Sequence, residues 1–289
     1  MITNEAVNQA IDYILQHIEE EISLETVAGQ CHLSKYYFCR VFKAQTGEGV
    51  YEFIRRVRLE QSAFRLKTER ERSITAISAD YGYSSSNYSS AFKLHYHMTP
   101  VFFRENSRKK TMEHPFFHQE SWQPESFEEC SRKMVFKDLP DYYVVYERRF
   151  GSYEYLSRNW GIFLEKYRQY LTAETEFLER TYDDPAVTQK NCLYDICMSV
   201  KEDCLLENTT TIQGGKYAVY PFRGHAKDIY KTYQTIFSEW LPRVSYELDS
   251  SRSLFDRYHL VDCTMPPANA KQKLVACYIE MEICVPIKG

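Results

Sequence analysis

An internal repeat with an offset of fifty residues is the feature that most constrains the fold of this chain. The segment Ser34–Lys43 (SKYYFCRVFK) returns as Ser84–Lys93 (SSSNYSSAFK), and the match runs without a gap from Leu24 to Phe53 in the first copy. Self-similarity at a fixed period indicates one supersecondary unit that is present twice. The sequence therefore predicts two copies of one small motif within about the first hundred residues.

Helical periodicity within each copy predicts two helices joined by a tight turn. Ser23 and Ser34 occupy positions typical of helix N-caps, because a serine hydroxyl can accept from the first free N–H groups of a helix. A helix over about residues 4–20 precedes the first copy, and a long basic helix, Tyr51–Lys67, follows it. The buried face of the second helix in the first copy is predicted to consist of Phe38, Val41 and Phe42.

The exposed face of that second helix is suited to DNA. Two helices joined by a short turn are a common means of placing one helix in the major groove. Arg40 can bind guanine through two hydrogen bonds, and Lys43 can neutralise a phosphate. The charges of this face fit a solvated surface as well as a DNA-binding one. The duplication favours DNA binding, because two reading helices can contact two segments of the major groove, whereas two ordinary helical hairpins need no such repeat. The other side chains off the buried face are Lys35, Tyr36 and Cys39.

Length and composition indicate an ordinary globular chain with more than one domain. Its 289 residues predict two or three domains, and 44% apolar with 26% charged residues is typical of soluble proteins. The net charge is +2 over residues 1–110 and −6 over the remainder. The nine cysteines form no C-x-x-C motif, and the chain has no signal-peptide pattern and no apolar run of about 18 residues. We therefore expect a cytoplasmic protein with reduced, mostly buried thiols.

Residues 109–130 are polar, contain two prolines and are predicted to be a linker between two domains. Beyond it, strand and helix patterns alternate. Strands are predicted within Val135–Tyr146 and at Phe177–Tyr182, Leu193–Val200, Lys216–Phe222 and Lys273–Ile287, with helices between Tyr153 and Leu171 and over Ile229–Leu241. The fold class is therefore an all-α double helix-turn-helix domain over residues 1–108, followed over residues 131–289 by an α+β domain of two similar strand–helix–strand–strand halves.

The closing strand contains the most suggestive ligand-binding pattern of the second domain. Alternation places Tyr278, Glu280 and Glu282 on one strand face. Two carboxylates and an aromatic ring suit a cationic or amphipathic small molecule through charge and ring-face attraction. A solvated strand face explains the same pattern without any ligand.

Other combinations of reactive residues are incomplete. His95 and His97, and His114 and His118, have metal-like spacing, but no cysteine or carboxylate set completes a four-ligand site. The sequence contains no Gly-rich phosphate loop and no G-x-S-x-G motif. We therefore predict no metal and no cofactor.

Residues 5–108 resemble the DNA-binding domain of AraC/XylS-type transcription regulators. The stretches that carry the resemblance are Leu24–Ala28 (LETVA), Ser34–Lys43, Gly47, Arg65–Leu66, Ile74–Ile77 (ITAI), Tyr81–Tyr83 (YGY) and Thr99–Arg104 (TPVFFR). The resemblance implies base reading by Tyr36, Cys39 and Arg40 in the first copy, and by Ser86, Asn87, Ser89 and Ser90 in the second, with Lys93 nearby. Because Ser90 replaces the arginine of the first copy, we predict that the first helix dominates base reading and that the second mainly positions the protein on the DNA backbone.

Residues 134–288 resemble the GyrI-like effector-binding domain. The stretches that carry this resemblance are Lys137–Pro140 (KDLP), Gly151–Tyr153 (GSY), Tyr182–Thr188 (YDDPAVT), Tyr194–Asp195, Gly214–Val219 (GGKYAV), Trp240–Pro242 (WLP) and Glu282–Ile287 (EICVPI). The resemblance implies a pocket glutamate just before the end of the final strand, which is Glu282 here, and a further acidic candidate at Asp256. The implied aromatic walls are Tyr153, Trp160, Tyr182, Tyr220 and Tyr278.

These patterns together predict a one-component transcription regulator rather than an enzyme. Its expected partners are double-stranded promoter DNA, a small cationic or amphipathic aromatic effector and RNA polymerase, with no membrane. One alternative is a small-molecule hydrolase in which Glu282 or Glu280 polarises water with Tyr278. Another is a ligand-sequestering protein fused to a DNA-binding domain. Two reading helices in one chain are compatible with binding as a monomer.

Overall fold

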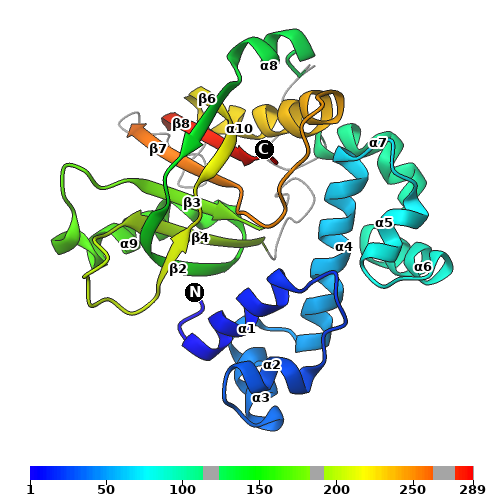
Figure 1. Cartoon of the computed structure of the whole chain (residues 1–289), viewed down its shortest axis with the longest axis horizontal. Helices are drawn as coiled ribbons and strands as arrows, with labels where there is room; N and C mark the ends of the chain where they lie inside the picture. The colour runs from blue at the N-terminus through cyan, green and yellow to red at the C-terminus, as the bar shows by residue number, and fades with distance from the viewer. Residues whose placement is uncertain (113–123, 183–191, 263–276, 289) are drawn as a thin grey trace. The chain divides into compact units, whose positions relative to one another are not determined.

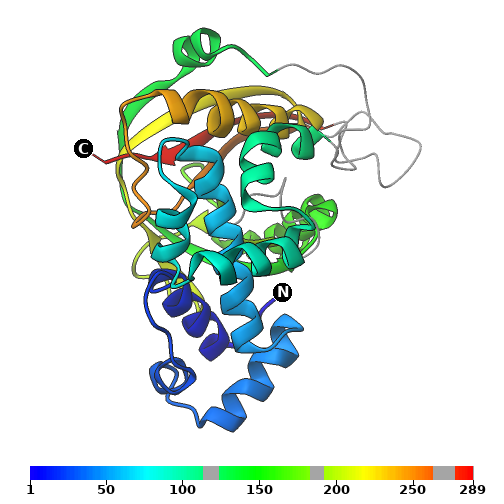
Figure 2. The same cartoon turned by 90° about the vertical axis from the view of Figure 1, so that its right-hand side faces the viewer.

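The computed structural model describes residues 1–112, 124–182, 192–262 and 277–288, and the chain divides into two compact units, Met1–Met112 and Glu113–Gly289. The first unit is helical and the second is built on a single β-sheet (Figures 1 and 2). Among the described residues, no helix is both long and apolar enough to cross a membrane.

The first unit has the duplicated architecture that the sequence predicts. The bounds of α5 and α6 and the first residue of α7 are those of α2, α3 and α4 shifted by fifty residues. The long helix α4 follows the first copy, and α1 precedes it. The helices are α1 (Glu5–Gln16), α2 (Leu24–Gln30), α3 (Lys35–Thr46), α4 (Val50–Thr68), α5 (Ile74–Asp80), α6 (Ser85–Tyr96) and α7 (Pro100–Met112).

Backbone conformation repeats with the same offset. The turn between the paired helices has a left-handed residue in each copy, His32 with φ 53° and Gly82 with φ 75°. The residue after each second helix is also left-handed, Gly47 with φ 80° and His97 with φ 57°. Where one copy has glycine at a left-handed position, the other copy has histidine. The left-handed geometry is therefore a property of the motif and does not depend on glycine alone.

Each copy is built around an aromatic core. Phe42 and Phe53 meet edge-on with ring centroids 5.3 Å apart, and Phe92 and Phe103 repeat this contact at 5.3 Å. Edge-to-face pairs of buried rings stabilise beyond their area burial by about 0.5–1.5 kcal/mol each. The repeated apolar positions of the sequence are therefore the core of each helix-turn-helix.

Helix α4 connects the two copies through polar contacts as well as packing. Arg56 is buried and bonds Glu48 at 2.8 Å and Glu60 at 2.7 Å. From the second copy, the buried Tyr88 hydroxyl donates to Ser62 Oγ of α4 at 2.9 Å. Because buried polar groups are costly unless paired, these bonds fix how each copy packs on α4.

The second unit contains one eight-stranded antiparallel sheet in the order β1-β6-β8-β7-β3-β4-β2-β5. Strands β3 and β7, each following a helix, pair at the middle of the sheet. The elements are α8 (Phe127–Lys133), β1 (Val135–Leu139), β2 (Tyr142–Gly151), η2 (Tyr153–Tyr155), α9 (Leu156–Lys166), η3 (Arg168–Tyr170), β3 (Phe177–Thr181), β4 (Cys192–Ser199), β5 (Thr209–Ile212), β6 (Gly215–His225), α10 (Ala226–Gln234), the π-helical segment η4 (Thr235–Trp240), η5 (Leu241–Arg243), β7 (Phe255–Asp262) and β8 (Tyr278–Pro286).

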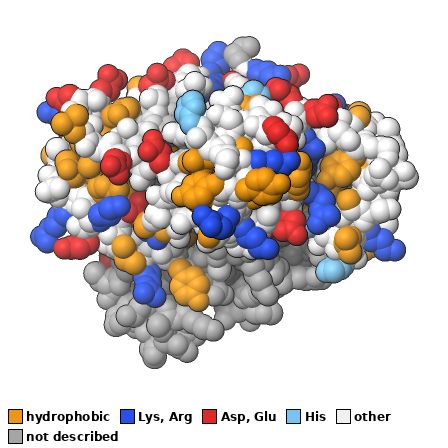
Figure 3. All heavy atoms as spheres, turned by 90° about the horizontal axis from the view of Figure 1, so that it is seen from below, with side chains coloured by type: hydrophobic (Ala, Val, Ile, Leu, Met, Phe, Trp, Pro, Cys, Tyr) orange, Lys and Arg blue, Asp and Glu red, His pale blue; other side chains and the backbone are white. Residues whose placement is uncertain are grey.

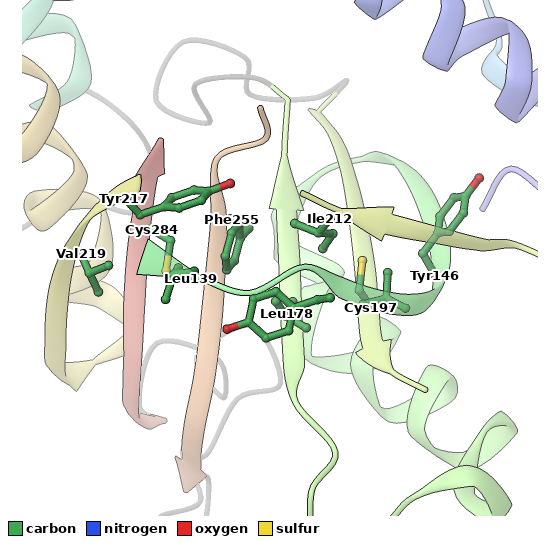
Figure 4. Close-up of a cluster of buried hydrophobic side chains, with 11 residues drawn as sticks. Leu139, Tyr146, Leu178, Cys197, Ile212, Tyr217, Val219, Phe255 and Cys284 are labelled. Carbon is green, nitrogen blue, oxygen red and sulfur yellow. The ribbon is translucent and has the colours of Figure 1, made fainter. Parts of the chain in front are cut away.

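One face of the sheet holds an apolar cluster to which all eight strands contribute (Figure 4). Leu139 of the edge strand β1 and Ile212 of the opposite edge strand β5 both belong to it. A flat sheet would keep these strands far apart, so the sheet must curl around the cluster. Phe255 of β7 lies at its centre, 5.2 Å from the Tyr217 ring and 5.8 Å from the Tyr142 ring.

Helices α9 and α10 cover the opposite face. Phe163 of α9 packs with Val145, Ile196 and other residues of that face. Ile196 pairs across strands with Glu179, and Glu179 pairs with Asp256, so these side chains share the helix-covered face. The candidate effector site lies on this face.

The structure also differs from the sequence predictions. It adds α8, β5 and β7, which the pattern did not predict. Helix α7 extends to Met112 and α8 begins at Phe127, so helix occupies both ends of the predicted linker 109–130. Seven described cysteines are free, but Cys277 is disulfide-bonded, which contradicts the expectation of reduced thiols at this position. A disulfide depends on the spatial approach of two sulfurs, which spacing along the chain does not reveal.

Candidate DNA interface and effector site

Helix α3 presents a mixed aromatic and basic surface. Tyr36 is 89% exposed, and the Arg40 guanidinium lies over the Tyr37 ring, 5.3 Å from its centroid. Lys35 forms an ion pair with Glu25 of α2. Stacking on a ring restricts the arginine before DNA arrives and so lowers the entropy cost of a base contact. The predicted readers of α3 all reach the surface, with Cys39 half-buried: Lys35, Tyr36, Cys39, Arg40 and Lys43.

Helix α6 presents hydroxyl and amide groups instead of an arginine. Ser84 caps the helix, its hydroxyl accepting from the Asn87 N–H at 3.4 Å. Small hydroxyls beside a helix N-terminus are suited to phosphate oxygens and carry little base specificity. The predicted contact residues of α6 are all exposed: Ser86, Asn87, Ser89, Ser90 and Lys93.

Figure 3 looks at the molecule from below the view of Figure 1 and shows basic, acidic and hydrophobic side chains interspersed on that face.

A pair of buried carboxylates lies on the helix-covered face of the second unit. Glu179 of β3 and Asp256 of β7 are direct cross-strand partners, and each is only 3% exposed. Glu179 Oε2 accepts from the Tyr258 hydroxyl at 3.1 Å and from Trp160 Nε1 at 3.4 Å. Asp256 Oδ2 accepts from the Tyr233 hydroxyl of α10. We name Glu179 and Asp256 the acid pair.

Burial makes ionisation of the acid pair unfavourable. Burial, reinforced by the charge of Asp256, raises the pKa of Glu179 to about 8. Burial likewise raises the pKa of Asp256 to about 7, although the Tyr233 hydroxyl works in the opposite direction. Two neighbouring carboxylates in a low-dielectric site titrate as a coupled pair, so near neutral pH the pair retains a proton.

Neither carboxylate has a cationic partner in the part of the chain that the structure describes. No lysine, arginine or histidine of these residues lies within 4 Å of Glu179 or Asp256 as an ion pair, and Asp256 Oδ1 is buried without a hydrogen-bond partner. Buried polar atoms are nearly always paired, so an unpaired carboxylate oxygen calls for an explanation. The neighbouring donors bond Oε2 of Glu179 and Oδ2 of Asp256, and they leave Oδ1 of Asp256 unsatisfied.

Aromatic rings surround the acid pair. Tyr233 and Tyr258 are only partly buried, in contrast to the carboxylates they bond. Trp160 of α9 meets Tyr258 edge-on with ring centroids 5.7 Å apart. Rings of this kind can contact a flat apolar group and the face of a cation at once.

The glutamate predicted for the pocket lies on the other face of the sheet. Glu282 pairs across strands with Arg257, whose Nε donates to it at 3.0 Å, and Lys137 Nζ donates to it at 2.5 Å. Burial opposes ionisation of Glu282, but Lys137 and Arg257 outweigh this effect and lower its pKa. Glu280 lies near Arg223, at 3.5 Å. Both glutamates therefore already have cationic partners.

The aromatic residues predicted to form the walls do not all come together: Tyr153 and Trp160 belong to the cluster on the helix-covered face, and the others lie outside this cluster. Tyr153 stacks on Tyr194 with ring centroids 4.6 Å apart, and Tyr278 meets the His225 ring at 6.0 Å. Among the described residues of the predicted set, Trp160 alone donates a hydrogen bond to the acid pair. Tyr220 also lies on the helix-covered face, but its hydroxyl donates to Glu125 at 2.8 Å and not to the acid pair.

Tyr182 belongs to a second buried charge cluster, on the face of the sheet that bears the apolar cluster. Asp195 accepts from Arg148 Nε at 2.8 Å, from Arg180 Nε at 3.1 Å and from the Tyr182 hydroxyl at 2.7 Å. Burial opposes its ionisation, yet the two arginines prevail and lower the pKa of Asp195 to about 2. This carboxylate is fully paired, in contrast to the acid pair.

Three side chains of the site, Glu179, Tyr233 and Tyr258, were not predicted from the sequence. Asp256 was noted there only as a further acidic candidate. Recognising β7 as a strand would have placed Asp256 and Tyr258 on one face, but not their neighbour Glu179, which comes from β3. Of the histidines in the metal-like motifs, His95 lies 3.7 Å from Glu60, and His114 and His118 lie outside the described residues. Among described residues, no group of three or more potential metal ligands occurs.

Family comparisons agree with this division into two units. A helix-turn-helix domain model matches residues 27–106, and the model of a GyrI-like small molecule binding domain matches residues 132–276, about half of the chain. The regulatory protein SoxS of Salmonella typhimurium is 32% identical over 105 residues, which cover 36% of this chain and 97% of SoxS. The chain belongs to the AraC family of transcription regulators. This confirms the resemblance inferred from its motifs.

Further relatives of this AraC-family regulator match over a little more than a third of the chain. The probable transcription factor PqrA of Proteus vulgaris is 34% identical over 103 residues, covering 35% of this chain and 84% of PqrA. The regulatory protein PocR of Salmonella typhimurium is 32% identical over 110 residues, but the match spans only 35% of PocR.

Solved structures resemble each unit. The DNA-binding domain of AdpA in complex with a target DNA matches with a TM-score of 0.35 and 21% identity, covering 37% of this chain and 96% of that chain. The EcmrR C-terminal domain matches with a TM-score of 0.40 and 17% identity, covering 53% of this chain and 96% of that chain. The two family models and the match to SoxS show that the protein is an AraC-type DNA-binding regulator that carries a GyrI-like small-molecule binding domain.

Proposed function

We propose that this AraC-family regulator senses a small cationic aromatic molecule at the acid pair, and that binding of this effector changes its occupancy of promoter DNA. The observation that carries the proposal is a pair of buried carboxylates with no cationic partner among the described residues. Elsewhere in the same sheet, Glu282 and Asp195 are neutralised by arginine or lysine. The acid pair is the exception, and a ligand cation is the charge that it lacks.

Electrostatics and the surrounding rings support this class of effector. A carboxylate in a low-dielectric site interacts strongly with an opposite charge, and an effector cation would offset the cost of ionising the pair. Tyr233, Tyr258 and Trp160 offer ring faces and edges to an apolar, flat body. A neutral ligand would gain the ring contacts alone.

The position of the acid pair suits a signalling role. Glu179 follows α9 and Asp256 follows α10, and the two residues meet where β3 pairs with β7. We further propose that the segments β2-α9-β3-β4 and β6-α10-β7-β8 are two similar halves, which makes this pairing their junction. A ligand bound there would contact both halves and bias their relative position.

On the DNA side, we propose that α3 reads bases and that α6 mainly contacts the backbone. Arg40, stacked on Tyr37, is the side chain best placed for a bidentate contact to guanine. The exposed hydroxyls of α6 favour phosphate contacts. Contact with RNA polymerase is part of this proposal as the route from DNA occupancy to transcription.

The test measures ligand binding and DNA binding together. Operators are first selected from random DNA, and affinity for the selected site is then measured with and without a panel of aromatic ammonium compounds. Wild type is compared with Asp256→Asn and, as a matched acid on the other face, Glu282→Gln. We expect Asp256→Asn to abolish the ligand response and Glu282→Gln to retain it. Equal loss in both variants, with folding intact, contradicts the assignment of the site. Ligand binding that leaves DNA affinity unchanged indicates a sequestering protein instead.

A further inference from the structure

The hydrogen bonds of the acid pair distinguish its four carboxylate oxygens. Tyr258 and Trp160 both donate to Oε2 of Glu179, and Tyr233 donates to Oδ2 of Asp256. Oδ1 of Asp256 is buried and has no partner. The described residues thus supply donors to one oxygen of each carboxylate, and Oδ1 of Asp256 is the oxygen that is buried without a partner.

We propose that the effector carries at least one N–H on its cationic group, as a protonated amine, amidine or guanidine, that donates to Oδ1 of Asp256, and that its binding expels a proton from the acid pair to solvent. This inference rests on the proposed function. It narrows the effector from any cation to one that is also a hydrogen-bond donor.

The requirement for a donor follows from the cost of leaving a buried acceptor unpaired. A quaternary ammonium group provides charge but no N–H, so it would bury Oδ1 of Asp256 further without satisfying it. A site built around a hydrogen bond discriminates strongly against an analogue that lacks the donor. We therefore expect at least about a tenfold weaker affinity for the fully methylated analogue of a given amine.

Proton release follows from the surroundings of the pair. Among the described residues, the titratable groups that interact with the pair are tyrosines, and no cation of these residues forms an ion pair with it. A pair whose pKa values lie at about 8 and about 7 holds protons at mildly acid pH, and an arriving cation favours their loss. The facing groups are Tyr194 of β4, Tyr230 and Tyr233 of α10, and Tyr258 of β7, with Glu147 bonded to Arg149 and Lys166 farther along the same face.

Because the bound cation replaces a proton of the acid pair, the affinity for the effector should rise with pH. Where the free pair is protonated, each bound cation releases about one proton, so affinity rises by about tenfold per pH unit. Once the free pair has lost a proton by itself, the dependence flattens. We expect the rise between about pH 5 and pH 7 and the plateau near pH 8, for a probe that stays cationic throughout.

The experiment uses the full chain and matched probes. Three primary ammonium compounds, the naphthylmethyl, indolylethyl and biphenylmethyl derivatives, are each compared with their N,N,N-trimethyl counterparts by isothermal titration calorimetry. Measurements at about pH 6 in two buffers of different ionisation enthalpy count the protons released. The variants Asp256→Asn and Glu179→Gln test the acid pair, and Glu282→Gln is the control. Thermal melting of each variant checks its folding.

Each outcome separates this inference from the proposed function. Tighter binding of a primary ammonium probe, with about one proton released and both effects lost in Asp256→Asn, supports both. Equal affinity for the trimethyl probes, or binding without proton release, overturns the inference while the cation site stands. Binding of no probe in any of the three pairs overturns both. Probe binding that is unchanged in well-folded Asp256→Asn and Glu179→Gln also overturns both the inference and the proposed function.

Discussion

Glu179 and Asp256 differ from the other buried acids of the second unit in what neutralises them. Asp195 bonds two arginines, and Glu282 bonds Lys137 and Arg257. For those acids the local cations outweigh the cost of burial and lower the pKa, whereas burial dominates at the acid pair and raises it. Buried carboxylates on one face of the sheet thus form structural ion pairs, and we propose that those on the other face bind the effector.

Replacing Glu179 by glutamine should stabilise the protein at alkaline pH. A carboxyl group whose pKa is higher in the folded state binds its proton more tightly there, so stability is lost as pH rises from about 4.5 towards about 8. Glutamine does not titrate, and its carbonyl can still accept from Tyr258 and Trp160. The gain in free energy of unfolding should grow from near zero at about pH 4 to the order of a few kcal/mol at about pH 8.

Urea unfolding across this pH range measures the effect, with Glu282→Gln as the matched comparison. Glu282 has a lowered pKa, so its loss should destabilise, and it should do so at neutral pH. A gain for Glu179→Gln that is the same at pH 5 and pH 8 would show that the carboxyl of Glu179 is not strained by burial.

Replacing Arg40 by alanine should weaken specific DNA binding by about 1–3 kcal/mol and relax specificity at the contacted base pair. The chain offers a matched control fifty residues later, because Ser90 occupies the equivalent position of α6. Ser90→Ala should cost less than Arg40→Ala, since a hydroxyl at that position contributes at most one backbone contact. Binding-site selection followed by titration of the best site measures both. Equal losses would assign equal weight to the two helices.

At the scale of the element, the two copies of the helix-turn-helix have different residues at the positions where the backbone is left-handed. Gly82 has φ 75° and open space around its Cα, so a methyl group there meets no atom but forces a left-handed conformation. Gly82→Ala should therefore destabilise by about 1–2 kcal/mol. Gly29 lies within helix α2 with equally open space and an ordinary φ, and the second copy already has Ala79 there.

Gly29→Ala should accordingly stabilise by about 0.5–1 kcal/mol, because alanine is the better helix former. The two substitutions add the same atom and differ only in backbone conformation. Chemical denaturation of both variants tests the difference. A shift of the same sign in both would mean that the left-handed turn is not maintained in solution.

The elements also show which parts of the fold are predictable from sequence. The helices of the first unit were predictable to within a few residues, because a repeat tests each periodicity twice; the first helix, predicted over about residues 4–20, ends at Gln16. In the second unit, alternation correctly placed Glu280 and Glu282 together on one face of β8, as their pairing with β6 and β7 shows. Alternation within a strand does not reveal its neighbours, and Lys137 and Arg257 come from two other strands. Strand β7 was missed because a buried aspartate interrupts its apolar pattern.

At the scale of the whole molecule, the proposal requires that effector binding to the second unit and operator binding to the first are energetically coupled. If effector binding changes operator affinity by some factor, then operator binding must change effector affinity by the same factor, because both are legs of one thermodynamic cycle. Couplings of this kind usually amount to about 1–3 kcal/mol, which corresponds to about 5–150-fold. The direction distinguishes an effector that recruits the regulator to DNA from one that releases it.

We therefore expect calorimetric titration of the best primary ammonium probe to give different affinities with and without saturating operator. The ratio should equal the ratio of operator affinities measured with and without saturating probe. Random DNA of equal length controls for non-specific charge effects, and Asp256→Asn should abolish both shifts together. A shift of operator affinity without the reciprocal shift would place the probe outside the equilibrium that links the units, for example on the DNA itself. A reciprocal shift that survives Asp256→Asn would assign the coupling to a site other than the acid pair.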